Sequence, residues 1–301
     1  MKINENKINY DLVFPLFEVQ KEIPKRINQI YIAPGKCPKG EELPIALLEK
    51  IYSTRKLNPN YKYKLWFSDD IEDFIKSTYG EIIWKYYDRV SSKYPAVKAD
   101  LFRYLLIYKE GGIYFDLKIT FSKSFDECLL PNDEYILSHW DNYTGGTHEG
   151  WGTLFPELSH IHRGEYIMGV IVAAPGHPFL RAVILQVLRN IESYDPYLHD
   201  VGWGGALAIG GPICYTLIIT KLQREMNIKN YREVDIVPDF GLEYSYKNTK
   251  LVKADYRKEY APVVKHDSKV KQIFNLSYFF LLSFYRQVRL RFLSSNKKVS
   301  E

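Results

Sequence analysis

Four charged side chains between residues 96 and 120 have types and spacings that could form a ligand-binding site. Asp100 and Arg103 lie three residues apart, which on a helix places both on one face. Asp116 follows a short apolar run, and Lys118 stands two residues later. A planar, permanently charged guanidinium suits an anionic ligand, and carboxylates bind hard divalent cations. Taken singly, each feature is more typical of ordinary structure, such as a surface ion pair or a strand-end aspartate.

The elements that must position these residues are a helix and the short strand after it. The run from residue 95 to 110 predicts a helix, because it opens with a proline and closes on Gly111 and Gly112. Residues 113 to 115 predict a strand that leads to Asp116. In open α/β sheets, ligands bind at the carboxyl ends of strands. The two glycines leave room for a ligand or a neighbouring helix to approach the backbone.

The rest of the chain alternates between strand-like and helix-like segments. Strands are predicted at residues 26–32, 63–67, 135–138, 166–173 and 262–267, and helices at 42–55, 178–191 and 212–225. This alternation predicts the α/β class, with a mostly parallel central sheet in a three-layer sandwich.

The stretch from residue 96 to 120 resembles the signature of glycosyltransferase family 32 and the related glucosylating toxins. That signature has a K-A-D-x-x-R-Y helix, then G-G-x-Y, then two aspartates spaced D-x-D. Its counterparts here are Lys98-Ala99-Asp100, Arg103-Tyr104, Gly111-Gly112-Ile113-Tyr114 and Asp116. Weaker similarities extend the resemblance over about residues 23 to 267, at Ile23-Pro24-Lys25, Asn58-Pro59-Asn60-Tyr61, Ala174-Pro175-Gly176-His177 and Gly211-Pro212.

The resemblance implies a GT-A fold, a sugar-nucleotide donor and transfer with retention of anomeric configuration. It assigns the chemistry to Asp100, Arg103 and Asp116, with Lys118 beside them, where charge on the departing diphosphate must be stabilised. The donor is further expected to contact the first two strands, the motif helix and later segments, through Ile30, Tyr31, Trp66, Tyr104, Gly111, Gly112, Gly211 and His266.

One position departs from the family pattern. Lys118 stands where the second aspartate of D-x-D is a ligand to Mn²⁺ or Mg²⁺, and a protonated ammonium cannot be a ligand. Either Lys118 supplies the metal's charge at the diphosphate, or Asp116 holds the metal with another group. On a regular strand, Asp116 and Lys118 share a face. Removing a strand-end Asp116 is expected to cost little stability, within roughly 0.5 kcal/mol.

Residues 139 to 165 form a long, glycine-bearing segment with several histidines. Long irregular segments in compact domains are typically binding loops or lids. Trp140 and Trp151 have flat apolar faces of the kind that stack on sugar rings, so the segment is expected to form an acceptor-side insertion. The alternative is that both tryptophans are core residues. His160 and His162 without a third partner make a weak metal site.

Composition limits the domain count, the compartment and the partners. The chain has 301 residues, 46% of them hydrophobic, which suits one large domain at residues 23–272 after a lead-in at residues 1–22. A net charge of +5 fits an anionic ligand, and no zinc-finger or RNP-like pattern suggests nucleic acid. Three separate cysteines and a polar N-terminus predict a cytoplasmic protein.

The C-terminal residues 273–301 are apolar in their first half and basic in their second. They predict an amphipathic helix that attaches peripherally to the inner face of an anionic membrane, where a lipid-linked saccharide acceptor would reside. The alternative is a helix that packs on the domain.

Two functional hypotheses follow. The first is a retaining transferase that moves a hexose from a UDP- or GDP-sugar to a saccharide acceptor in polysaccharide or glycan synthesis. The second is a catalytically inert sugar-nucleotide-binding protein derived from such an enzyme. The lysine at position 118 is the reason for this alternative. A dinucleotide-binding dehydrogenase is disfavoured, because the sequence has no G-x-G-x-x-G.

Overall fold

A six-stranded sheet forms the centre of the protein. The computed structural model describes residues 10–32, 43–244, 259–265, 277 and 281. The sheet has the order β2-β1-β3-β6-β5-β7, with bounds β1 Arg26–Ile30, β2 Lys62–Trp66, β3 Gly112–Phe115, β5 Tyr135–Leu137, β6 Val170–Ala173 and β7 Arg232–Glu233. A second, two-stranded sheet pairs β4 (Ile119–Phe121) with β8 (Leu242–Tyr244).

The sheet is mixed, and it confirms the predicted α/β, GT-A-like class. The β1–β2, β1–β3 and β5–β7 pairs are parallel, whereas β6 runs antiparallel to both β3 and β5. The prediction of a mostly parallel sheet is therefore confirmed, with β6 as the one antiparallel strand among the described strands of this sheet. A parallel neighbour needs a crossover connection, but the irregular segment from residue 138 to 169 returns the chain to the edge of β5 in the opposite direction.

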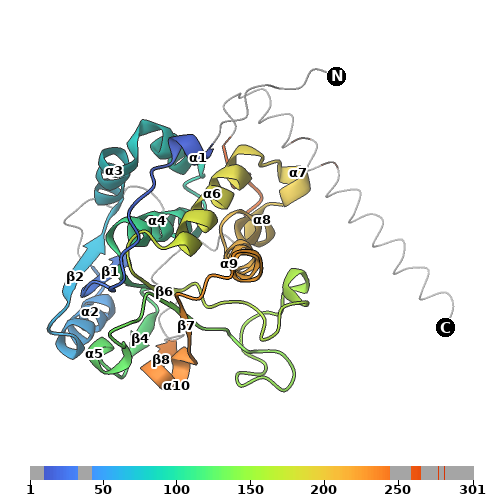
Figure 1. Ribbon diagram of the computed structural model, residues 1–301. Coiled ribbons are helices and arrows are strands. Elements are labelled where there is room, and N and C mark those ends of the chain that lie inside the picture. Colours follow the sequence, from blue (N-terminus) through green and yellow to red (C-terminus); the bar gives the residue numbers. More distant parts are fainter. Residues whose placement is uncertain (1–9, 33–42, 245–258, 266–276, 278–280, 282–301) are drawn as a thin grey trace, which may run out of the picture.

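Helices and the small sheet cover the two faces of the central sheet (Figure 1). One face packs on α3 (Ser68–Arg89), α4 (Pro95–Glu110), α6 (Pro178–Glu192) and α9 (Pro212–Met226). The other face packs on β4, β8, α5 (Phe125–Cys128) and α10 (Ile236–Phe240). The remaining elements are α1 (Tyr10–Val13), α2 (Ile45–Leu57), α7 (Pro196–His199), α8 (Gly202–Ile209) and a 3-10 turn at Pro156–Leu158.

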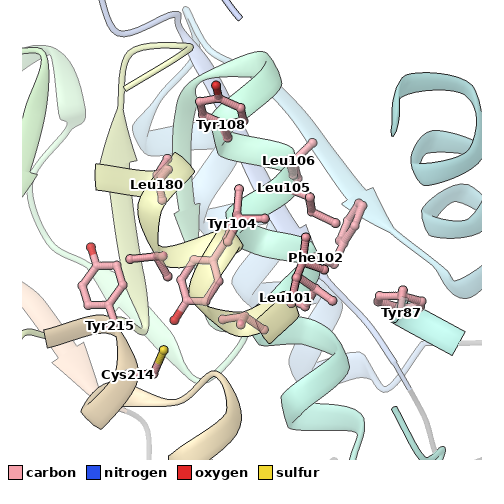
Figure 2. Packing of buried hydrophobic residues seen from close by; sticks show 14 of the residues in the cluster. Tyr87, Leu101, Phe102, Tyr104, Leu105, Leu106, Tyr108, Leu180, Cys214 and Tyr215 are labelled. Atoms are coloured by element: carbon pink, nitrogen blue, oxygen red, sulfur yellow. The ribbon is translucent and has the colours of Figure 1, made fainter. Parts of the chain in front are cut away.

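Helix α4 bears the motif residues Asp100 and Arg103, and most of its residues are buried. Its bounds are those predicted, because Pro95 at the first turn and Gly111 at the end are local signals. Leu101, Phe102 and Leu105 are fully buried, and side chains from α4, α6 and α9 interleave around them (Figure 2). A helix that is apolar on nearly all faces lies inside a domain. Any charged residue on α4 must therefore find a partner there.

The described part of the predicted lead-in belongs to the domain. Phe14 is 2% exposed and stacks on Tyr79 and Tyr108 at centroid distances of 5.4 and 5.7 Å. The Gln20 amide donates to the Pro175 carbonyl at 3.0 Å. The predicted C-terminal helix at residues 273–301 lies outside the described residues, except for Ser277 and Leu281.

Among the described residues, one helical stretch, Gly202–Met226, is long and apolar enough to span a membrane by length and composition. Half of its most apolar window is buried inside the protein. A break at Gly210 and Gly211 divides it into α8 and α9. Core helices pass the same test, and α9 packs against α6 within the core.

Gly111 and Gly112 pack against the chain itself. Both have positive φ, at 63° and 92°. A Cβ on Gly111 would lie 2.5 Å from Pro175 Cδ, and a Cβ on Gly112 would lie 2.7 Å from the Arg26 carbonyl oxygen. The glycines therefore allow the start of β3 to approach β1 closely.

We expect Gly112→Ala to destabilise the fold more than Gly80→Ala. Gly80 also has a positive φ, of 81°, but a Cβ there would meet no atom within 4 Å. Gly80→Ala should cost about 1 to 3 kcal/mol from backbone strain alone, because φ 81° with ψ 174° is a conformation that only glycine adopts readily. Gly112→Ala adds a clash with the β1 backbone and should cost about 1 to 3 kcal/mol more than Gly80→Ala. Equilibrium urea unfolding of both variants measures the difference, and equal costs would contradict this packing.

Candidate active site

A buried guanidinium joins the two elements of the motif. Arg103 on α4 is 5% exposed. Its Nη2 donates to Asp100 Oδ1, one helical turn earlier. Its Nη1 donates to Asp116 Oδ1 at 3.1 Å and to the Met168 carbonyl at 3.0 Å. Arg103 therefore ties α4 to the end of β3 and to the segment before β6.

Asp116 presents the more accessible carboxylate of the pair. Its side chain is 23% exposed, compared with 10% for that of Asp100. Tyr114 Oη donates to Asp116 Oδ1 at 2.7 Å, and Lys118 Nζ lies 3.4 Å from Oδ2. Burial by itself raises the pKa of Asp116, but the charges of Arg103 and Lys118 and the bond from Tyr114 outweigh it, so the pKa lies below its usual value.

Lys118 reaches Asp116 through a turn rather than along a strand. Strand β3 ends at Phe115, and the Ile119 amide donates to the Asp116 carbonyl at 2.9 Å. The strand ends at Phe115, as predicted, so the condition of a regular strand through Lys118 is not met, although the two side chains do lie close together. The Lys118 side chain is 61% exposed, so it can move toward a ligand without crossing the core.

Four further residues surround Asp116 that the sequence did not single out. A Cβ on Gly169 would lie 3.3 Å from Asp116 Oδ2 and 3.2 Å from Tyr244 Oη. Lys50 on α2 donates from Nζ to the Leu117 carbonyl at 3.4 Å, and burial lowers its pKa. Gln29 Nε2 donates to the Phe115 carbonyl at 3.4 Å. They come from four separate parts of the chain, so no spacing in the sequence signals them.

The residues predicted on the first two strands lie in or near the core. Ile30 is 7% exposed. The Tyr31 amide donates to the Trp66 carbonyl at 2.9 Å. Trp66 is 6% exposed, and its Nε1 donates to Asn28 Oδ1 at 2.9 Å. The Trp66 ring packs against Phe74 and Phe102, with Lys64 Nζ 3.3 Å from its centroid. Trp66 thus makes the contacts of a core residue.

Three predicted donor contacts are corrected by the structure. Tyr104 is fully buried and donates from Oη to the Gly210 carbonyl at 2.9 Å, so it supports the neighbouring helices. Gly111 and Gly112 lie at the start of β3, whereas Asp116 follows its end. Four strand residues span about 13 Å, so the two glycines lie at the opposite end of strand β3 from Asp116.

Of the two remaining predicted donor contacts, Gly211 and His266, the structure describes Gly211. Gly211 is the N-cap of α9. Its neighbour Gly210 lies close to the motif helix, because a Cβ there would be 3.8 Å from Asp100 Cβ. The structure therefore brings the Gly210–Gly211 turn beside Asp100. His266 lies outside the described residues.

The predicted acceptor-side tryptophans lie close to each other. Trp140 is half-buried, and its ring is 6.3 Å from that of Trp151 and 5.3 Å from that of Tyr244. Trp151 is 44% exposed. Lys118 Nζ lies 5.7 Å from the Tyr244 centroid. Tyr244 therefore connects Trp140 to the surroundings of Lys118, and the irregular segment stands next to the charged cluster.

Glu165 at the end of that segment is a buried acid. It is 8% exposed, and its Oε2 has no hydrogen-bond partner among the described residues. Burial raises the pKa of Glu165 to about 8. A carboxyl group in an apolar setting keeps its proton, because ionisation there is costly. No sequence pattern distinguishes it from the surface glutamates nearby.

The residues around Asp116 do not fit a divalent cation. Within the part of the chain that the structure describes, no group of three or more His, Cys, Asp or Glu residues could hold a metal. Both oxygens of Asp116 already face donors, with Arg103 and Tyr114 on Oδ1 and Lys118 next to Oδ2. A metal ion beside Asp116 would meet the positive charges of Arg103 and Lys118, and the Asp100 carboxylate is already bonded to Arg103.

Comparison with known proteins places the motif region among sugar transferases. Residues 45–136 match the family model described as "Glycosyltransferase sugar-binding region containing DXD motif". The matched residues include Asp100, Arg103, Asp116 and Lys118.

Curated relatives have mannosyltransferase names. The chain is 30% identical over 181 residues to inositol phosphoceramide mannosyltransferase 3 of Schizosaccharomyces pombe, covering 58% of this chain and 40% of that protein. It is 25% identical over 231 residues to mannosyl phosphorylinositol ceramide synthase SUR1 of Saccharomyces cerevisiae, covering 77% of this chain and 50% of that protein. The chain thus spans at most half the length of these relatives.

A solved structure, the PaToxG glycosyltransferase, is similar with a TM-score of 0.47 and 18% identity, covering 73% of this chain and 75% of that chain.

The structure changes the expected cost of losing Asp116. Asp116→Ala would leave buried Arg103 with one carboxylate and should cost about 2 to 3 kcal/mol, rather than a few tenths. Lys118→Ala removes a mostly exposed charge and should stay within about 0.5 kcal/mol. Chemical unfolding of the two variants compares them, and an Asp116→Ala variant as stable as Lys118→Ala would contradict the buried network.

Glu165 should make stability fall with rising pH. Its folded pKa of about 8 exceeds the ordinary value of 4.5, so the unfolded chain releases the proton first and gains free energy between these two pH values. Glu165→Gln removes this penalty. The variant should gain about 3 to 4 kcal/mol relative to the unsubstituted protein between pH 5 and pH 8. Unfolding at both pH values tests this, with exposed Glu157→Gln as the control, and a gain that is the same at both would refute it.

Proposed function

We propose that this protein is a glycosyltransferase that moves a hexose from a nucleoside diphosphate sugar to a saccharide or lipid-linked saccharide acceptor. The observation that carries the proposal is the Asp100–Arg103–Asp116 network at the carboxyl end of β3. It lies in the region that matches the DXD sugar-binding model. Ligands of α/β proteins usually bind at the carboxyl ends of the strands.

The two aspartates of this network differ in solvent exposure, and we assign them different roles for that reason. Asp116 is the more accessible carboxylate and accepts hydrogen bonds from hydroxyl groups of the donor sugar. Asp100 is nearly covered and bonds Arg103, so it positions the guanidinium. Departure of the nucleoside diphosphate develops negative charge, which nearby cations stabilise. Lys118 and Lys50 are the lysines closest to the Asp116–Leu117 turn, and they supply this charge.

We further propose that transfer retains the anomeric configuration. In this scheme the leaving diphosphate itself accepts the proton of the attacking acceptor hydroxyl, so no separate general base is required. The half-exposed pair Trp140 and Trp151 supports an acceptor side next to Lys118, because flat indole faces stack on sugar rings.

Mannose is the first candidate for the transferred hexose, and a GDP-sugar is accordingly the first donor to test. The support is that relatives bear the names inositol phosphoceramide mannosyltransferase and mannosyl phosphorylinositol ceramide synthase. These names also favour an acceptor presented on a lipid, which suits peripheral attachment to the cytoplasmic face of a membrane. A UDP-hexose is the second donor.

Lys118 is proposed to replace the divalent cation of D-x-D enzymes. Its ammonium stands next to the Asp116 carboxylate, where it can pair with the diphosphate when a donor binds. A cation about 4 Å from a diphosphate in a partly dry cleft contributes several kcal/mol. The competing proposal is an inert protein that binds the donor without turnover, which the same lysine would explain.

Donor turnover distinguishes the two proposals. The full chain is incubated with GDP-mannose or UDP-glucose, and release of GDP or UDP is measured together with the thermal shift. We expect nucleotide release from one donor and a loss of at least 100-fold in Asp116→Asn, about 2.7 kcal/mol in the barrier. A donor-induced rise in Tm without any release would support the inert protein instead.

Activity should survive EDTA because the charge of Lys118 is built into the chain. Lys118→Ala should lower kcat at least tenfold, whereas exposed Lys85→Ala on α3 should not. Lys118→Asp restores D-x-D and should make activity depend on Mn²⁺ and be lost with EDTA. Nucleotide release measured with EDTA and with Mn²⁺ tests this. Complete loss of activity of the unsubstituted protein in EDTA, with Lys118→Ala fully active in Mn²⁺, would show the lysine to be incidental.

A further inference from the structure

The irregular segment between β5 and β6 encloses a cavity of about 640 Å³. This volume lies within the range of about 300 to 1,000 Å³ that is usual for small-molecule sites. One part of its wall is apolar, formed by Leu154, Phe155 and Leu158. The lining also includes residues that can form hydrogen bonds, among them Tyr143 and Glu165. The cavity therefore offers both apolar and polar side chains to a ligand.

Glu165 has an unmet hydrogen-bonding capacity at this wall. The residue is 8% exposed, and its Oε2 has no partner among the described residues. Leaving a buried polar group unpaired is costly, so native proteins do so rarely. The neutral acid form both donates and accepts a hydrogen bond, which matches the two roles of an alcohol hydroxyl.

The arginine charge at the cavity is compensated by carboxylates. Among the described lining residues the arginine is Arg163, which lies 3.7 Å from Asp141 and 3.9 Å from Glu233, measured from nitrogen to carboxylate oxygen. Both carboxylates thus offset its charge. Glu165 in its acid form adds no charge to the cavity wall. A phosphate would have to displace these carboxylates, whereas a neutral ligand would not.

The cavity is also connected through the backbone to the charged cluster around Arg103 and Asp116. The Trp140 amide donates to the Glu165 carbonyl at 2.9 Å. Three residues after Glu165, the Met168 carbonyl accepts from Arg103 at 3.0 Å. A ligand in the cavity therefore lies next to a segment whose far end is fixed to the charged cluster.

We propose that this cavity binds a neutral cyclic polyol, a pyranose or an inositol ring, with Glu165 hydrogen-bonded to a ring hydroxyl and Phe155 against the apolar face. This inference rests on the proposed function in one respect, because it assigns the cavity to the sugar acceptor. Glu165 is then a binding residue of the acceptor and takes no part in donor binding.

The test measures binding without a donor and transfer separately. Saturation-transfer NMR with methyl α-D-mannopyranoside and with myo-inositol reports on binding to the full chain. We expect at least one of them to bind at millimolar concentration, Glu165→Leu to weaken binding at least tenfold, and Glu165→Gln to remain within about threefold. Glu157→Leu, on the same segment but outside the cavity wall, should bind as the unsubstituted protein does.

A second variant keeps the test decisive if Glu165→Leu fails to fold. Ser159 is exposed and lines the cavity, so Ser159→Trp fills space without disturbing the core and should weaken polyol binding at least fivefold. In transfer assays, Glu165→Leu and Ser159→Trp should raise the acceptor KM and leave the donor KM unchanged.

Three outcomes would overturn the proposal: no polyol binding, binding that Glu165→Leu and Ser159→Trp leave unchanged, or binding that GDP displaces. Preferential binding of mannose 6-phosphate over the neutral sugar would also contradict it. The proposed transferase function fails differently, because a protein that releases no nucleotide from any donor could still bind the polyol in this cavity.

Discussion

The structure depends on one buried positive charge. The guanidinium of Arg103 is 5% exposed and stays protonated under all ordinary conditions. A buried charge is tolerated only when it is paired and hydrogen-bonded, so Asp100, Asp116 and the Met168 carbonyl must converge on it. Those partners come from α4, the end of β3 and the segment before β6. Pairing this charge therefore also fixes where three parts of the fold meet.

The same pairing determines what the site can bind. Two carboxylates, Arg103 and Lys118 leave the cluster with no net charge. A metal ion would add positive charge beside Arg103 and Lys118, whereas a diphosphate can attract the exposed ammonium of Lys118. The resemblance to D-x-D enzymes and the matched sugar-binding region support a donor site. The donor chemistry we propose nevertheless follows from the lysine.

The charged cluster and the cavity beside it have opposite electrostatics. The cluster holds fixed charges at the end of a strand, which suits a diphosphate. The cavity holds a protonated Glu165 and a compensated Arg163, which suits hydroxyl groups. The short stretch from Glu165 to Met168 joins the two. A transferase needs such a division, because its donor is anionic and its acceptor reacts through an alcohol.

The sequence by itself determined the features that depend on neighbouring residues. The proline and glycine signals predicted the bounds of α4, the i, i+3 spacing predicted the Asp100–Arg103 pair, and alternation of segments predicted the α/β class. Only the tertiary structure decided which residues are buried and which distant residues lie close together. It placed Gly112 far from Asp116, enclosed Tyr104 in the core, reversed β6 and buried Glu165. Burial and pairing arise from contacts between residues distant in the chain, and sequence spacing carries no record of those contacts.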